Sequence, residues 1–327
     1  MRSAFIKKLT ALIKDDENAV FLSANCGWGV LDDLASELGE IGAKARNGKN
    51  GRYLDVGIAE QNMIALAAGL AADGKRAFVY SISNFPTLRA LEHIRNLILY
   101  PKLNVKIISI GAGFIYGAQG MTHHMTEDMG VMRSLPNIKI FTPCDPIEAL
   151  AIARLCAASD NAAYIRIQRG GETTLHSAEL SDCEIESLAN GAPIAIGEES
   201  PNASIVIIAS GAIACEAIEA QRNLAERGVI ANVYSACTLP LDCGAIARLA
   251  KRADRIITLE EHNAQGALGS AVGEVLTHLQ SSVKLVRLGL QNTFAVAVGD
   301  QPYLREVYGL NAQTIVEAVK HVKPLKL

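Results

Sequence analysis

The stretch RYLDVGIAEQNMIALAAGLAADG, residues 52–74, decides how the rest of the chain is interpreted. Its pattern predicts a short strand, a turn and then a helix whose first turn carries one carboxylate, Glu60. From Met63 to Ala72 only a glycine interrupts the aliphatic residues. We therefore expect this helix to be buried on all sides rather than amphipathic.

Glu60 has two possible roles on local features alone. Burial raises the pKa of a carboxyl group and can suit it to proton transfer. Alternatively, Glu60 complements the helix dipole, and Asp55 or an upstream backbone group completes a cap. Acids are common in the first turn of helices, so the local pattern favours the cap and leaves the chemical role open.

Composition limits the class of protein. The chain has 327 residues, of which 50% are hydrophobic and only 5% aromatic, a balance typical of helices packed on parallel strands. A net charge of −3 without Lys/Arg clusters argues against nucleic acid or an anionic membrane as partner. No apolar run approaches the roughly 18 residues of a membrane span. Seven scattered cysteines without a C-x-x-C pair indicate reduced thiols, and we expect a soluble, cytoplasmic protein.

Short apolar strand patterns alternate with helical patterns along the chain, which predicts βαβ units and parallel sheets. Residues 172–203 lose this periodicity and gather Ser, Glu, Asn, Gly and Pro, as expected at a domain boundary. We predict an α/β protein of two tandem doubly wound domains with mainly parallel sheets. The first covers residues 1–175, a linker covers 176–190, and the second covers 191–327.

Ligands of doubly wound sheets bind beyond the carboxyl ends of the strands, which directs attention to the loops 57–60, 81–85 and 111–128. The glycines near residue 111 have the wrong spacing for a dinucleotide fingerprint, and no P-loop motif occurs. In the third loop, His123, His124, Glu127 and Asp128 offer pairs at i, i+4 spacing. These pairs could bind a metal, stay solvated, or contact a substrate. Adjacent helix positions point about 100° apart, so all four cannot face one ion.

Three stretches carry a family resemblance: YLDVGIAEQNMIALAAGLAADGK (53–75), LEHIRNLILYPKLNVKIISIGAG (91–113) and GAQGMTHHMTEDMGVMRSLPNIKIFTPCDPIEA (117–149). They resemble the pyrimidine-binding domain of thiamine-diphosphate enzymes of the transketolase group. TLPLD (238–242) and LEEHNAQGALGSAVGEVL (259–276) are similar to the C-terminal domain of that group. The pairing of G-I-A-E-Q with G-x-T-H at this distance is specific, and the resemblance spans nearly the whole chain.

The resemblance implies roles for individual residues. Glu60 would hydrogen-bond a ring nitrogen of the cofactor aminopyrimidine and so assist removal of the thiazolium C2 proton. Phe85, with Tyr80 as second candidate, would stack on that ring, and Ile58 would also contact the cofactor. His123 would contact the substrate near its reacting carbon. Arg169, with Arg89 as a second possibility, would bind a substrate phosphate.

The chain departs from the family pattern at two positions. The family motif is G-[EA]-D-G-x-T-H, so Gln119 replaces an aspartate that meets a sugar hydroxyl. Gly111 stands where transketolases place a histidine that helps to bind the sugar phosphate. An amide can still hydrogen-bond a hydroxyl, but glycine supplies no cation. The identity of the ketose donor is therefore less secure than the cofactor chemistry.

Full-length members also contain a domain that binds the diphosphate through Mg²⁺ with a G-D-G motif, which is absent here. The resemblance implies the C-terminal subunit of a split transketolase, with no protein ligand for the metal in this chain. Thiamine diphosphate and Mg²⁺ would then bind only with an N-terminal partner subunit, in an assembly of two copies of each chain. The expected activity is ketol transfer between sugars. The alternatives are a subunit that decarboxylates a 2-oxo acid, and a non-catalytic interaction subunit.

Overall fold

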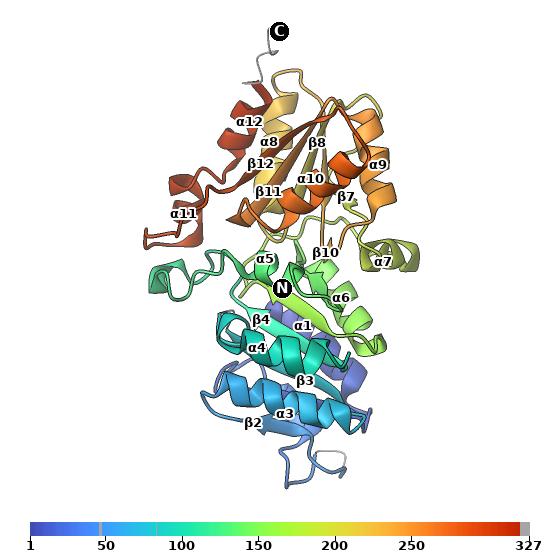
Figure 1. Cartoon of the computed structure of the whole chain (residues 1–327), viewed down its shortest axis with the longest axis vertical. Coiled ribbons are helices and arrows are strands. Elements are labelled where there is room, and N and C mark those ends of the chain that lie inside the picture. Colours follow the sequence, from blue (N-terminus) through green and yellow to red (C-terminus); the bar gives the residue numbers. More distant parts are fainter. Residues whose placement is uncertain (46–47, 83, 321–327) are drawn as a thin grey trace.

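A computed structural model describes residues 1–45, 48–82 and 84–320 (Figure 1). The predicted loop 39–50, strand 75–83 and helix 311–321 each include residues outside these ranges. The chain folds into two α/β units, one above the other in Figure 1, each built on a mainly parallel sheet. This architecture confirms the predicted fold class.

The first sheet has the strand order β10-β5-β6-β4-β3-β1-β2. Its strands are β1 (Ala19–Ser23), β2 (Tyr53–Asp55), β3 (Arg76–Ile82), β4 (Val105–Ile110), β5 (Lys139–Phe141), β6 (Ala163–Ile167) and β10 (Thr238–Leu239). Neighbours are parallel except β10, which is antiparallel to β5. The central strands β4 and β6 are buried along their whole length, since helices cover both faces of the sheet.

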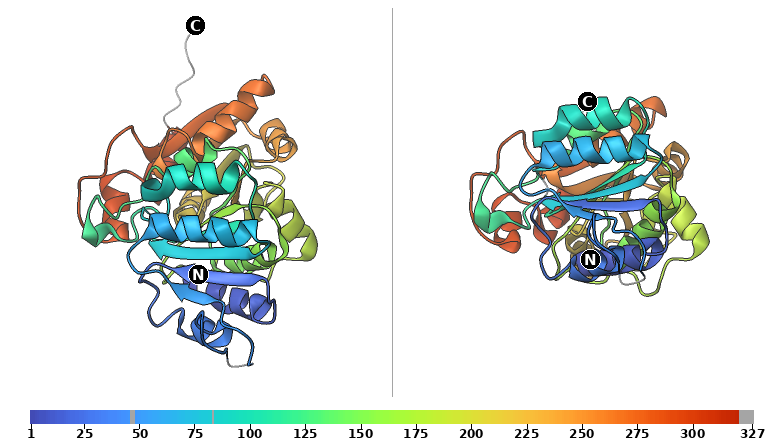
Figure 2. Two further views of the ribbon diagram at one scale, coloured as in Figure 1. Left: turned by 60° about the horizontal axis from the view of Figure 1, so that its bottom comes forward. Right: turned by 90° about the horizontal axis from the view of Figure 1, so that it is seen from below.

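Helices pack on both faces of this sheet, and Figure 2 shows α3 and α4 side by side on one of them. The elements outside the sheet are α1 (Arg2–Ile13), α2 (Asp32–Leu38), α3 (Glu60–Ala72), η1 (Leu88–Ala90), α4 (Leu91–His93), η2 (Ile94–Leu99), η3 (Gly117–Gln119), α5 (Asp128–Arg133), α6 (Pro146–Ala158) and α7 (Asp182–Ala189). The sequence pattern of residues 87–99 predicts a single helix, but this segment forms a 3₁₀ turn, one α turn and a π-helical stretch. Helix α7 lies inside the segment predicted as a linker.

The expectation that α3 is buried on all sides is wrong. Its inner face, which includes Met63, Ile64 and Ala67, is buried, but Leu66 on the outer face is 39% exposed. The sheet covers only one side of the helix, and an all-apolar sequence cannot show whether anything covers the other side. The neighbouring stretch η2 likewise exposes Leu97, so an apolar surface runs across these two elements.

The second sheet has the order β12-β11-β8-β9-β7, and β7 alone pairs in antiparallel fashion. Its strands are β7 (Ile194–Ile196), β8 (Ile205–Ser210), β9 (Ala231–Ser235), β11 (Arg255–Asn263) and β12 (Lys284–Leu290). The helices are α8 (Ala214–Ala225), α9 (Cys243–Arg252), α10 (Leu268–His278), α11 (Gln301–Val307) and α12 (Ala312–Lys320).

The two units share buried structure. Strand β10 belongs to the second unit in sequence but completes the sheet of the first, and one apolar cluster continues from α3 to α10. At the junction, the buried Arg166 donates to Asp128 Oδ2 at 2.7 Å and to the carbonyl oxygens of Met125 and Glu261. Asp128 Oδ2 also accepts from the Tyr164 hydroxyl at 2.7 Å. The guanidinium group of Arg166 in the first unit therefore bonds residues of both the 111–128 loop and β11.

We expect Asp128→Ala to lower the free energy of unfolding by about 3–5 kcal/mol, because it leaves a buried arginine without its counter-ion. Chemical denaturation monitored by circular dichroism measures this change. The matched control is Asp182→Ala, which removes an exposed partner of Arg154 and should cost less than about 1 kcal/mol. Equal effects of the two variants would contradict a structural role for the buried pair.

Candidate active site

Glu60 is the first residue of α3 and is only 2% exposed. Glu60 is an acid in the first turn of α3, where a carboxylate complements the helix dipole, but the helix has no side-chain cap, so the cap expected from Asp55 does not form. Asp55 instead shapes the preceding turn, since its Oδ1 accepts from the amides of Gly57 and Asn25 and its Oδ2 accepts from the Ser23 hydroxyl. This turn brings Glu60 to the carboxyl edge of the sheet.

Arg89 bridges Glu60 and Phe85. Its Nη1 donates to Glu60 Oε2 at 2.7 Å, and its Cζ lies 4.5 Å from the centre of the Phe85 ring. The arginine side chain is 45% exposed, so its position depends on these two contacts rather than on burial. Arg89, predicted as a second possible phosphate ligand, therefore pairs with Glu60 in this structure.

A row of rings continues from Phe85. The His123 ring meets the Phe85 ring edge-on at 5.5 Å and the Tyr116 ring at 6.3 Å. Arg169 lies 5.8 Å from the centre of the Tyr116 ring. Asn84 holds the two loops together, because its amide donates to the carbonyl oxygens of residues 122 and 124. A chain of side-chain contacts thus links four predicted residues: Glu60, Phe85, His123 and Arg169.

Tyr116 and Arg2 are components that the sequence did not reveal. A side chain at Gly111 would overlap the Tyr116 ring, since its Cβ would lie 2.1 Å from a ring carbon. Gly111 therefore leaves room for this tyrosine next to His123. Burial raises the pKa of the Tyr116 hydroxyl, and the nearby guanidinium groups of Arg2 and Arg169 oppose that rise. Tyr116 thus lies beside two cations.

The remaining predicted residues are Tyr80, Ile58 and Gln119. Tyr80 is 2% exposed and packs against Phe21 in the core, where burial raises the pKa of its hydroxyl. Its ring is therefore not accessible for stacking, and Phe85 is the better candidate. Ile58 is 74% exposed, and Gln119 is an exposed residue of η3.

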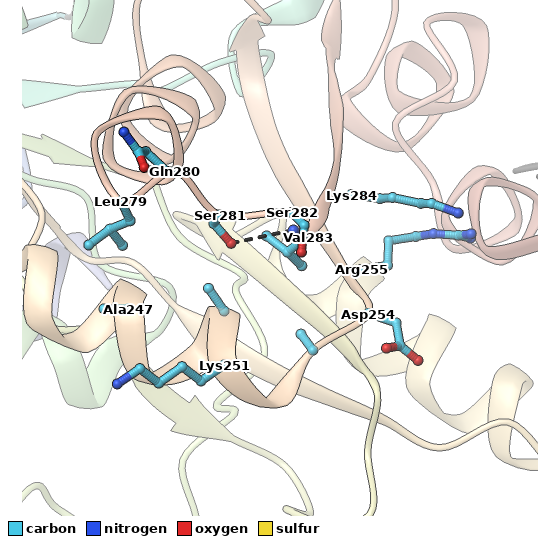
Figure 3. A pocket seen from close by; sticks show the side chains of 12 residues that line it. Ala247, Lys251, Asp254, Arg255, Leu279, Gln280, Ser281, Ser282, Val283 and Lys284 are labelled. Atoms are coloured by element: carbon cyan, nitrogen blue, oxygen red, sulfur yellow. Dashed lines mark hydrogen bonds between the residues drawn. The ribbon is translucent and has the colours of Figure 1, made fainter. Parts of the chain in front are cut away.

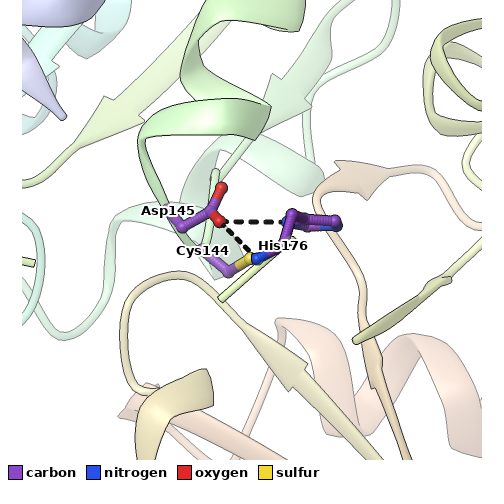
Figure 4. Close-up of side chains that lie close together, drawn as sticks. All are labelled: Cys144, Asp145 and His176. Carbon is purple, nitrogen blue, oxygen red and sulfur yellow. Dashed lines mark hydrogen bonds and ion pairs between the residues drawn. The ribbon is translucent and has the colours of Figure 1, made fainter. Parts of the chain in front are cut away.

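The four residues weighed for a metal do not converge. His124 faces backbone carbonyl oxygens, Asp128 pairs with Arg166, and the Glu127 carboxylate accepts from Thr126. Cys144, Asp145 and His176 do lie close together at the start of α6 (Figure 4). Asp145 Oδ2 accepts from His176 Nδ1 at 3.0 Å and from two backbone amides, while Oδ1 caps the helix. These contacts occupy the carboxylate, so the group fits a structural tie better than a metal centre.

A cavity of about 810 Å³ lies elsewhere, between the ends of α9 and α10 and the starts of β11 and β12 (Figure 3). Lys251, Arg255 and Lys284 are among its lining residues, and no predicted site residue is. It opens at the amino ends of the strands, the opposite edge from the usual ligand site of such sheets. We do not assign it to the active site.

Comparisons with known proteins agree with the geometry. Residues 1–171 match the transketolase pyrimidine-binding domain, and residues 196–315 match the transketolase C-terminal domain. One of the subunits of the apulose-4-phosphate transketolase of Phocaeicola vulgatus is 30% identical, and the match covers 98% of this chain and 97% of that protein. A 6-deoxy-6-sulfo-D-fructose transketolase subunit of Clostridium sp. (strain MSTE9) is 34% identical over 84% of this chain and 83% of its own.

Among solved structures, a split-gene transketolase in an inactive beta4 tetramer superposes with a TM-score of 0.83 at 32% identity. The match covers 100% of this chain and 99% of that one. The chain belongs to the transketolase family, and several of its relatives are subunits of transketolases, including a split-gene transketolase. All seven cysteines are free thiols, and no helix among the described residues is long and apolar enough to cross a membrane.

The hydrogen bond between Asp145 and His176 leads to a prediction of how the stability of the protein depends on pH. Burial lowers the pKa of His176, but the Asp145 hydrogen bond and the Glu148 charge outweigh it and raise the pKa above 6.5. Burial raises the pKa of Asp145, but the His176 and backbone hydrogen bonds outweigh it and hold the pKa at about 2. Asp145 therefore stays ionised throughout the range in which His176 titrates.

A raised histidine pKa adds stability that is complete below the unfolded value of 6.5 and is lost as pH rises through the folded value. We expect the stability difference between wild type and His176→Gln to be largest at mildly acidic pH and to shrink towards alkaline pH. Denaturation curves at several pH values measure it, with His278→Gln on the exposed end of α10 as control. A difference that grows with pH would contradict the assignment.

Proposed function

We propose that this chain is the pyrimidine-binding subunit of a two-subunit, thiamine-diphosphate-dependent transketolase that transfers a two-carbon ketol unit from a ketose to an aldose. The row from Glu60 through Phe85 to His123 and Arg169 is the observation that carries the proposal. It joins a buried carboxylate, an aromatic platform, a histidine and a cation in the order that cofactor and sugar would require.

The contacts of Arg89 indicate that Glu60 and Phe85 fit the aminopyrimidine ring of the cofactor. Its guanidinium is a flat, N–H-donating group that lies over Phe85 and bonds Glu60. An aminopyrimidine has the same two requirements, a ring to stack on and a carboxylate to share a proton with. The position of Arg89 therefore supports Glu60 and Phe85 as ligands of such a ring, with Ile58 as an additional apolar contact.

When bound, thiamine diphosphate supplies the nucleophilic carbon and the electron sink for ketol transfer. Glu60 would hold or release a proton at a ring nitrogen, a task suited to a carboxylate that water barely reaches. Phe85 would orient the ring. His123, adjacent to Phe85 and hydrogen-bonded through Nδ1 to Thr122 Oγ1 at 3.0 Å, would donate to an oxygen of the reacting sugar.

The donor that we propose is a ketose with an anionic terminal group, in keeping with the expectation of a phosphorylated sugar. Arg169 and Arg2 flank Tyr116 at the end of the row that is farther from Glu60, so an anion there would meet two cations. The two transketolases whose subunits are compared above are named for a phosphate and a sulfo sugar, which agrees with this chemistry. Gln119 is exposed on the same loop and would bond a sugar hydroxyl.

The partner that we propose is an N-terminal transketolase subunit that supplies the Mg²⁺ and diphosphate ligands, with two copies of each chain in the assembly. Three exposed apolar side chains provide a surface for this partner. They are Ile58, two residues before Glu60, Leu66 on the outer face of α3, and Leu97 on η2. The inactive tetramer of the related split-gene transketolase supports dependence on a second kind of chain. We retain residues 1–175 and 191–327 as the two domains, joined by 176–190.

Replacing Glu60 tests the function directly. We expect Glu60→Gln, combined with the N-terminal subunit, cofactor and Mg²⁺, to lose ketol transfer by roughly 100-fold or more, because an amide cannot accept and return a proton. A coupled assay of aldose formation measures the rate, and size-exclusion chromatography confirms assembly. Glu92→Gln, a first-turn glutamate exposed on α4, is the matched control and should keep its activity.

Three outcomes would count against the proposal. Ketol transfer by the wild-type chain alone would remove the need for a partner. Full activity of the Glu60→Gln complex would identify a non-catalytic interaction subunit. Release of carbon dioxide from pyruvate without ketol transfer from any sugar would indicate a subunit for 2-oxo-acid decarboxylation.

Replacing Arg169 tests the anionic end of the site. We expect Arg169→Ala to raise the KM for a phosphorylated ketose by roughly 10- to 100-fold, the range for losing a charged hydrogen bond. The KM for the same ketose without phosphate should change little. Arg222→Ala, an exposed arginine on α8, is the control. A similar rise in KM for both sugars would show that Arg169 does not bind the phosphate group.

A further inference from the structure

His124 follows the candidate substrate residue His123, but its side chain lies at the junction with the second domain and is 4% exposed. Its Nδ1 lies 3.1 Å from the carbonyl oxygen of Ala295, and its Nε2 lies 3.3 Å from the carbonyl oxygen of Gly117. Ala295 belongs to the segment between β12 and α11, and Gly117 begins η3. The Phe114 ring meets the imidazole edge-on at 5.6 Å.

Both neighbours of this imidazole are acceptors. A carbonyl oxygen cannot donate, and a neutral imidazole carries a proton on only one nitrogen. The two contacts are therefore hydrogen bonds at the same time only when both ring nitrogens carry protons. A neutral ring would keep one bond and turn a lone pair towards the other carbonyl oxygen.

The loop that carries His123 is packed tightly against the second domain around this point. The Phe114 amide donates to Glu261 Oε2 at 3.1 Å, and the Phe114 ring stacks on Tyr308 at 5.5 Å. A side chain at Gly117 would lie 2.4 Å from Leu304 and 2.5 Å from the carbonyl oxygen of Gly299. The carbonyl oxygen of Gly117 also accepts from the amides of Gly120 and Gly299.

We propose that His124 is a positioning residue for His123: as an imidazolium it fastens the 111–128 loop to the segment between β12 and α11. This inference rests on the proposed function. The segment 291–299 and α11 would then set the place of the substrate histidine, although neither belongs to the row of site residues. His124 itself touches neither cofactor nor sugar.

Several charged and titratable groups of the elements packed around His124 have partners among the described residues. Glu261 of β11 bonds Arg305 of α11 and the Gln301 amide, and the Tyr308 hydroxyl accepts from the Ala297 amide. His123, on the same loop, bonds Thr122. The two carbonyl oxygens are thus the groups that stabilise a charge on His124.

Histidine-selective ¹⁵N NMR of the full chain near neutral pH tests the protonation state without any activity. We expect one imidazole, identified by its absence in His124→Phe, to show protons on both ring nitrogens. A single protonated nitrogen at this position would overturn the proposal. Because no partner chain or sugar is involved, this result is independent of whether the proposed function holds.

The steady-state kinetics of the assembled pair test the positioning role. We expect His124→Phe to raise the KM for the ketose about 10-fold, while the apparent affinity for thiamine diphosphate stays within about 2-fold. His278→Phe, on the exposed end of α10, is the control. A folded His124→Phe pair with unchanged ketose KM would overturn the proposal, and an inactive wild-type pair would instead refute the proposed function.

Discussion

Arg166 is the side chain on which the arrangement of the two domains depends. It is 2% exposed and bonds the Asp128 carboxylate, the Met125 carbonyl and the Glu261 carbonyl. Burial lowers the pKa of Arg166, but the adjacent Asp128 charge outweighs this effect and keeps the guanidinium charged. A buried cation tolerates few arrangements of its acceptors, so β6, the start of α5 and the end of β11 are held in one mutual position.

The position of the loop that carries His123 follows from this constraint. The loop 111–128 leaves β4, passes along the second domain and returns through Met125 to Arg166, with His123 in its middle. Its contacts with the second domain include backbone groups, the Phe114 ring and the Nδ1 atom of His124, which specify position closely. The second domain contributes no residue to the row from Glu60 to Arg169. Its contribution is to hold the loop that does.

The residues of the candidate site differ in their exposure to solvent according to their proposed roles. Glu60 is almost entirely buried at the first turn of a helix, whereas Arg89, Arg169 and Ile58 are exposed. Arg169 and Ile58, which we propose to contact a sugar anion and a second chain, face outward, whereas Glu60, the proposed proton-transfer group, is buried. Leu66 of α3 and Leu97 of η2 are also partly exposed, and we propose that the partner subunit covers them.

The sequence by itself determined the alternation of strands and helices, the parallel sheets, the family, and the choice of Glu60, Phe85 and His123 as candidate site residues. These features follow from local hydrophobic periodicity and from short motifs, which are written in consecutive residues. Tertiary structure alone decided that α3 has an open outer face, that β10 joins the first sheet, and that Arg89 pairs with Glu60. It also placed Tyr116 in the space above Gly111 and turned His124 towards Ala295. Each of these depends on contacts between residues far apart in the chain, for which no local pattern carries a signal.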